Sequence, residues 1–160
     1  YDWQPAQGER PFPDVLEVLP ELHGHGLGLG IVTNASHPMH WRDRELVAMD
    51  LLNWFPACRV AAVDVGYIKP HQAIFRHALG LLDLQPDEAV FVGDNLHADI
   101  RGAQDIGMPA VWRPRLADGV PVALPDEENG VVPDGTITTL HDLLPLLDGW
   151  YPGWRNGHHE

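Results

Sequence analysis

The feature that most constrains the fold is a regular alternation between short apolar runs and longer segments with helical periodicity. Short apolar runs bounded by glycine or polar residues are typical of buried strands, and apolar residues three and four apart predict helices. The expected strands are 27–33, 60–65, 88–93 and 109–112, and the expected helices are 14–22, 41–55, 72–82, 96–106 and 138–148. This order predicts parallel strands joined by right-handed crossovers, with helices on both faces. We therefore expect an α/β fold, a three-layer α/β/α Rossmann-like sandwich with a mainly parallel sheet.

The composition excludes several classes of protein. The 160 residues suit one domain, and 44% of them are apolar, which is enough for a core. No apolar run approaches the roughly 18 residues of a membrane-spanning helix, so we expect no membrane partner. The net charge of −13 argues against a nucleic-acid partner, because phosphate contacts need clustered Lys and Arg. The one cysteine, Cys58, excludes a disulfide framework and suits a reducing cytoplasm, where we place the protein.

Segments without clear periodicity divide the chain. Residues 1–12 are polar with Pro and Gly, and are interpreted as a hinge or linker; residues 13–150 form the core domain. Pro20 conflicts with the first helix and is expected to kink or shorten it. Residues 114–135 are rich in proline and acids and indicate a long surface loop, and residues 151–160 are interpreted as a frayed tail.

Polar side chains follow three of the expected strands. The first strand ends in Thr33 and Asn34, the loop after the second contains Lys69, and the third is followed by Asp94, with Asp99 one turn into the next helix. Because ligands of open parallel sheets bind at the carboxyl ends of the strands, we expect these side chains to converge. The set suits a phosphate together with a hard divalent cation such as Mg²⁺. The helix that begins near residue 96 would add backbone donors.

These motifs resemble those of the haloacid dehalogenase (HAD) superfamily of hydrolases, in its phosphatase-like branch. The resemblance covers about residues 11–148 and is carried by the segments 31–34 (IVTN), 69–70 (KP) and 93–100 (GDNLHADI), followed by GA at 102–103 and GM at 107–108. It implies that Thr33 binds the phosphoryl group, that Lys69 steadies this group and the nucleophile, and that Asn34 adds a donor. It also implies that Asp94 ligates Mg²⁺ and that Asp99 supports the metal site, directly or indirectly.

One motif of the family is absent from this chain. The family's nucleophile lies in an Asp-x-Asp-x-Thr motif, and no Asp-x-Asp occurs in the sequence. The resemblance therefore implies that the nucleophile strand and a cap lie upstream, with residues 1–12 as the hinge. We expect the parent protein to be a Mg²⁺-dependent phosphatase that acts on a small phosphoester through an aspartyl-phosphate, while this chain alone is inactive. The alternatives are a catalytically inactive binding or scaffold module and, less favoured, a metal-independent 2-haloacid dehalogenase, a branch that lacks the Gly-Asp pair.

The resemblance also implies an incomplete sheet. The family's nucleophile strand lies centrally, between the strands expected at 27–33 and 88–93. Both of these are apolar with little charge, as interior strands are. We therefore expect an upstream segment or a second chain to fill the gap between them.

Simpler interpretations exist for several of the same residues. Thr33 and Asn34 are common turn residues, and Asp94 could cap the following helix. Asp134-Gly135-Thr136 looks like the end of the nucleophile motif, but Val132 stands where the nucleophile would be, so we expect a surface loop there. Most of the ten histidines are expected to be solvated, apart from His37 and His40, which are placed to face the site.

Overall fold

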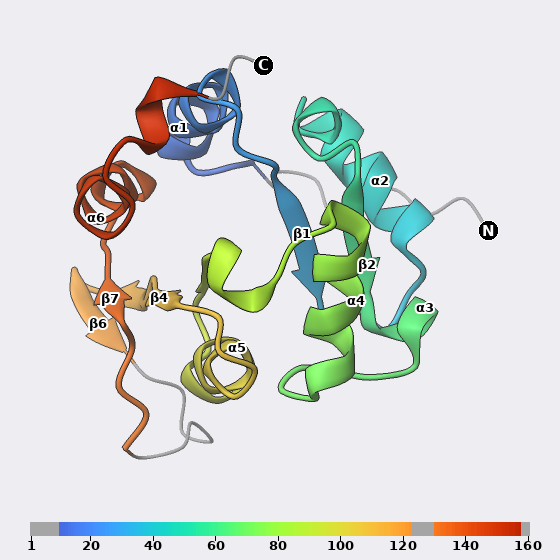
Figure 1. The fold of residues 1–160 in the computed structure, drawn as a ribbon. Coiled ribbons are helices and arrows are strands. Elements are labelled where there is room, and N and C mark those ends of the chain that lie inside the picture. Colours follow the sequence, from blue (N-terminus) through green and yellow to red (C-terminus); the bar gives the residue numbers. More distant parts are fainter. Residues whose placement is uncertain (1–9, 123–129, 158–160) are drawn as a thin grey trace.

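The computed structural model describes residues 10–122 and 130–157, which form helices around parallel strands (Figure 1). The strands are β1 Gly30–Thr33, β2 Cys58–Ala61, β3 Phe91–Gly93, β4 Ala110–Trp112, β5 Arg115–Ala117, β6 Val120–Val122 and β7 Gly135–Thr136. The α-helices are α1 Pro13–Gly24, α2 Met39–Ala48, α3 Ala62–Val65, α4 Gln72–Leu82, α5 Gly102–Gln104 and α6 Leu143–Trp150. The π-helix is η3 Leu96–Arg101, and the 3₁₀ turns are η1 Leu52–Trp54, η2 Pro86–Glu88, η4 Leu140–Asp142 and η5 Trp154–Asn156. No helix of the described part combines the length and apolarity needed to cross a membrane.

The main strands form two parallel sheets. In the first, β1 pairs with β2, with Gly30 opposite Cys58 and Thr33 opposite Ala61. In the second, β4 lies between β3 and β7, and Val92 is opposite Val111. All five strands are parallel to their neighbours, and helical segments join β1 to β2, β2 to β3 and β3 to β4, which confirms the predicted α/β class.

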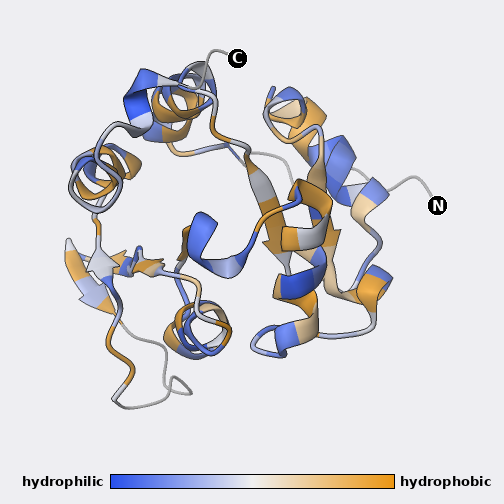
Figure 2. Ribbon diagram, in the orientation of Figure 1, coloured by the Kyte–Doolittle hydropathy of each residue, from blue (hydrophilic) through white to orange (hydrophobic). Residues whose placement is uncertain are grey.

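Helices cover both faces of these strands, so the predicted three layers are present. One buried cluster joins α1 and α6 to one face and includes Val18, Val111 and Leu147. The other joins α4 and η3 to the opposite face and includes Phe75 and Ile100. Figure 2 shows the corresponding pattern, with apolar strands and helices that carry one apolar and one polar side.

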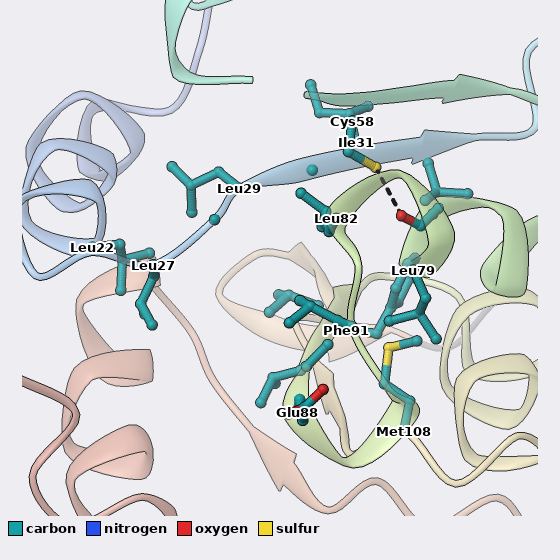
Figure 3. A pocket seen from close by; sticks show the side chains of 18 of the residues that line it. Leu22, Leu27, Leu29, Ile31, Cys58, Leu79, Leu82, Glu88, Phe91 and Met108 are labelled. Carbon is teal, nitrogen blue, oxygen red and sulfur yellow. Dashed lines mark hydrogen bonds between the residues drawn. The ribbon is translucent and has the colours of Figure 1, made fainter. Parts of the chain in front are cut away.

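No pairing joins β1 to β3 among the described residues, and a cavity of about 650 Å³ separates them. Residues 28–32 line one side of it and residues 90–92 line the other. Leu79 and Leu82 of α4 close one face, and Leu22 of α1 lies toward the other (Figure 3). This groove, called the β1–β3 groove below, has apolar walls and lies between two strands that are not paired with each other.

The second strand differs from the sequence expectation. Strand β2 ends at Ala61, and the residues predicted to extend it, 62–65, form helix α3. A short apolar run has no periodicity that separates a strand from a buried helical turn. The turn is held by Asp64, whose Oδ2 accepts a hydrogen bond of 2.8 Å from the Met39 amide at the start of α2.

The expected loop over 114–135 was only partly correct. It contains a β-hairpin, β5–β6, and the last strand, β7, begins at Gly135. The two turn residues of the hairpin, Asp118 and Gly119, have positive φ of 50° and 78°, and Asp-Gly is a strong signal for this kind of turn. Pro121 obscured the signal, because proline is unusual within strands.

Pro20 and the C-terminal residues differ from expectation in detail, whereas Pro145 lies where it was expected, near the start of the last helix. Helix α1 continues through Pro20, which faces solvent, so water can reach the backbone group that proline leaves unpaired. Pro145 lies in the first turn of α6, where no amide donor is needed. Residues 151–157 are ordered rather than frayed: Arg155 pairs with Glu21 of α1 at 2.6 Å and with Asp148 of α6 at 2.7 Å.

A buried carboxylate fastens the start of α1 to the core. Asp14 Oδ2 accepts a 2.6 Å hydrogen bond from the Leu140 amide and lies 3.0 Å from Arg113 Nη2, which follows β4. Only 9% of Asp14 is exposed. The guanidinium of Arg113 in turn lies 4.5 Å from the centre of the Phe12 ring.

We expect Asp14→Ala to lower the free energy of unfolding by about 2–3 kcal/mol, since it leaves a buried amide and a guanidinium without their acceptor. Glu17→Ala on the same helix is the control. Glu17 also has a side-chain partner, with its Oε2 2.8 Å from His141 Nε2, but its side chain is 66% exposed, so a change within about 0.5 kcal/mol is expected. Urea denaturation measures both; equal losses would contradict a special role for Asp14.

Candidate active site

The residues after β1 fasten it to the loop that follows α3. Asn34 Oδ1 accepts a 2.7 Å hydrogen bond from the Lys69 amide, and Asn34 Nδ2 donates to the Lys69 carbonyl at 3.1 Å. These bonds use the acceptor and one of the two amide hydrogens, and the other hydrogen remains for a ligand. Thr33 Oγ1 accepts from the Ala35 amide at 3.2 Å, which leaves its hydroxyl hydrogen to donate.

Lys69 turns back across the carboxyl end of β1. Its Nζ donates to the Val32 carbonyl at 3.1 Å and to Asp99 Oδ1 at 2.6 Å. The side chain is only 11% exposed. Two of the three ammonium hydrogens are thereby used, so one remains to bind an anion at this edge.

Asp99 is the buried partner of this lysine. Its Oδ1 binds Lys69, and its Oδ2 accepts 3.1 Å hydrogen bonds from the amides of Asp94 and Asn95. Both oxygens are therefore occupied, which fits a role in positioning Lys69 better than direct metal ligation. The expected N-terminal donors of the following helix are used here as well, since the Ala98 amide binds Asn95 Oδ1 at 2.7 Å.

Asp94 points out at the same edge. Its side chain is 44% exposed, and its Oδ2 accepts a 2.7 Å hydrogen bond from Arg115 Nε at the start of β5. The Asp94 carbonyl is held by Trp112 Nε1 at 2.9 Å. The structure thus brings Thr33, Lys69 and Asp94 to one edge, as predicted; their chemical roles stay predictions.

Gly93 permits the close packing of this site. A Cβ at this position would overlap the Asp99 carboxylate and Cβ, so we expect Gly93→Ala to displace Asp99 and with it Lys69. The expected cost is about 1–3 kcal/mol in the free energy of unfolding. Gly80→Ala in α4 is the control: a Cβ there meets nothing within 4 Å, and alanine should stabilise the helix by about 0.5–1 kcal/mol. Denaturation that ranks the two variants in the opposite order would contradict this packing argument.

The described residues include no group of three or more His, Cys, Asp or Glu side chains able to hold a metal ion. Mg²⁺ needs fewer protein ligands than such a group supplies, because it keeps several waters and binds one or two carboxylates together with substrate phosphate. The exposed carboxylate of Asp94 beside the phosphate-binding candidates fits that requirement in part, and further oxygen ligands must come from elsewhere.

Three further residues were considered in the sequence analysis: His37, His40 and Asp134. The structure shows which residues each of them contacts. His37 and His40 flank Trp41, with ring centres 6.0 and 6.2 Å from it. Asp134 precedes β7, and its Oδ2 accepts a 2.8 Å hydrogen bond from the Ala110 amide at the opposite end of β4 from Asp94. The motif-like segment that begins at the exposed Val132 therefore does not belong to the site.

Sequence reasoning missed Arg115 and Trp112. Both lie at or just after the carboxyl end of β4, the neighbour of β3, so the rule that selected Thr33, Lys69 and Asp94 would also have selected them. Residues 114–135 were interpreted as a surface loop, so Arg115 was not associated with this edge of the sheet.

Comparison with known proteins identifies the family. A model of the haloacid dehalogenase-like hydrolases matches residues 4–113. The chain belongs to this family. Among curated HAD relatives, a glyceraldehyde 3-phosphate phosphatase of Methanopyrus kandleri is 33% identical over 86% of this chain and 57% of its own length. A phosphoserine phosphatase of Thermus thermophilus is 35% identical over 72% of this chain and 45% of its own. The chain thus spans about half the length of the curated HAD relatives that it matches.

Solved HAD structures agree on the fold. A HAD phosphatase of Thermococcus onnurineus aligns with a TM-score of 0.71 and 36% identity, over 86% of this chain and 58% of its own. A 2-haloacid dehalogenase of Pseudomonas syringae aligns with a TM-score of 0.68 and 32% identity, over 87% of this chain and 54% of its own. Because both activities occur among the similar HAD proteins, overall similarity does not select between them.

Proposed function

We propose that this chain is part of a Mg²⁺-dependent phosphatase that hydrolyses a small phosphoester through an aspartyl-phosphate. The nucleophilic carboxylate would come from a strand that fills the β1–β3 groove and is supplied by residues outside 1–160 or by another chain. The observation that carries the proposal is that the groove ends at Lys69, which is among its lining residues.

The walls of the groove favour a strand as its occupant. Within residues 10–122 and 130–157, each of the two flanking strands is paired on one side only, β1 with β2 and β3 with β4. Their other edges carry backbone donors and acceptors that need partners. An extended apolar segment between them would satisfy these groups and would be covered by helices on both faces. A polar residue at the carboxyl end of that segment would meet the Lys69 ammonium.

The residues at this edge would support the proposed reaction by binding the phosphoryl group and stabilising its charge. A carboxylate oxygen of the inserted strand attacks phosphorus, the bond to the ester oxygen breaks, and the alcohol leaves after taking up a proton. Water then attacks the aspartyl-phosphate and releases phosphate, which restores the carboxylate. The remaining hydrogens of Lys69, Thr33 and Asn34 would bind phosphoryl oxygens throughout. Asp94 would hold a Mg²⁺ ion, which would neutralise part of the clustered negative charge.

Asp94 favours the phosphatase over the dehalogenase. An exposed carboxylate beside the anion-binding groups suits a divalent cation, and a metal-independent dehalogenase has no use for one. If no carboxylate enters the groove, the same pocket would make an inactive binding module, so the identity of the inserted strand decides between these functions.

The substrate class follows from the size and charge of the site. One lysine, one hydroxyl and one amide suit a single phosphoryl group, and the HAD relatives are named for glyceraldehyde 3-phosphate and phosphoserine. We further propose that residues 1–12 lead from a cap outside this chain, and that the enzyme works in the cytoplasm without nucleic-acid or membrane partners, given its net charge of −13 and one buried cysteine.

Trapping of the phosphoenzyme tests this function. The full-length protein is mixed with a phosphate-labelled substrate and Mg²⁺, quenched in acid and digested, and the labelled peptide is identified by mass. We expect an acyl phosphate, cleaved by hydroxylamine, on an aspartate outside residues 1–160. Multiple-turnover hydrolysis by a purified chain of residues 1–160 would contradict this location of the nucleophile.

A further inference from the structure

The hairpin β5–β6 contributes little to the core of the protein. All six residues of its two strands are exposed, including Leu116, Val120 and Val122. In the part of the chain that the structure describes, the two strands pair with each other and with neither of the main sheets. Apolar burial therefore does not hold the hairpin beside the site.

A contact at its first residue joins the hairpin to the site. Arg115 Nε lies 2.7 Å from Asp94 Oδ2, on the carboxylate that the proposed function assigns to Mg²⁺. The other arginine at this edge, Arg113, is directed to Asp14 and is 20% exposed, whereas Arg115 is 60% exposed. The contact between Arg115 and Asp94 is thus open to solvent.

We propose that Arg115 is a positioning residue that competes with the divalent cation for Asp94 and so sets the cation affinity of the site. The proposal rests on the proposed function, because it takes Asp94 as the cation ligand. A guanidinium and a divalent cation on one carboxylate repel each other, so each weakens the binding of the other. By thermodynamic linkage, the Arg115–Asp94 contact weakens cation binding by the same free energy by which the bound cation weakens this contact.

The size of the effect is bounded by the exposure of the pair. Exposed ion pairs contribute modestly and are screened by salt. We therefore expect Arg115→Gln to tighten cation binding about two- to fivefold at low ionic strength, and we expect the difference to fade in concentrated KCl.

The test uses the full-length protein and Mn²⁺ alone, with free Mn²⁺ measured by electron paramagnetic resonance at low and high KCl. Arg101→Gln is the matched control, because this substitution removes the same charge. Arg101 is also exposed, and its Nε lies 2.8 Å from Asp105 Oδ1. Tighter binding by Arg115→Gln than by Arg101→Gln, lost at high salt, is the expected result. Unchanged or weaker binding by Arg115→Gln would overturn the proposal.

Failure of the unaltered protein to bind Mn²⁺ at all would contradict the proposed function as well, whereas binding that is indifferent to Arg115 contradicts this proposal alone.

Discussion

Replacing Lys69 with alanine is expected to reduce kcat about 10²- to 10³-fold, the usual effect of removing one donor that stabilises transition-state charge. Steady-state hydrolysis of a small phosphoester by the full-length protein measures it. The same change should also lower the free energy of unfolding by about 3–5 kcal/mol, because it leaves the buried Asp99 carboxylate without its cation.

A double variant separates these two effects. In Lys69→Ala/Asp99→Asn, the amide oxygen of asparagine can still accept from the Asp94 and Asn95 amides, and no buried charge remains. We expect stability to be largely recovered while turnover stays low. Recovery of turnover together with stability would show that Lys69 acts only through the fold.

The second large effect concerns the β1–β3 groove. In the full-length protein, the amides of β1 and β3 should be protected from hydrogen exchange as strongly as those of β2 and β4, which serve as internal controls. The free edges span four residues of β1 and three of β3, about seven backbone hydrogen bonds at about 1 kcal/mol each. Their loss, roughly 7 kcal/mol, is comparable with the whole stability of a domain.

Residues 1–160 expressed alone should therefore unfold at much lower urea concentration than the same residues in the full-length protein, and should associate through the free edges. Protection of β1 and β3 that does not change with protein concentration would indicate a strand from the same chain. Fast exchange of β1 and β3 in the full-length protein, with β2 and β4 protected, would show that nothing fills the groove.

The position of the candidate site could be predicted because it depends on topology. Parallel strands that alternate with helices bring their carboxyl ends to one edge, so Thr33, Lys69 and Asp94 could be placed together without knowledge of any contact. The HAD assignment followed from the same segments and is confirmed by the family match.

The hydrogen-bond partners in the site could not be predicted in this way. Whether Asp99 faces a metal or a lysine depends on differences of a few ångströms in the turn that follows Gly93. Helix α3 was missed for a related reason: its apolar run fits a strand equally well, and the Met39 amide that Asp64 binds lies 25 residues earlier in the chain. Arg115 was missed because a hairpin with no apolar burial leaves no periodic signal.

The environment of Cys58 has a practical consequence for measuring movement of the β5–β6 hairpin. Its side chain is buried against Gly30, its Sγ donates to the Ala78 carbonyl at 3.6 Å, and burial raises the pKa of the thiol. The reactive thiolate form is thereby suppressed. Cys58 is also the one cysteine in these 160 residues. A second cysteine introduced at the exposed Ala117 could thus carry a fluorophore or spin label without removal of the native thiol, and movement of the hairpin could be followed in real time.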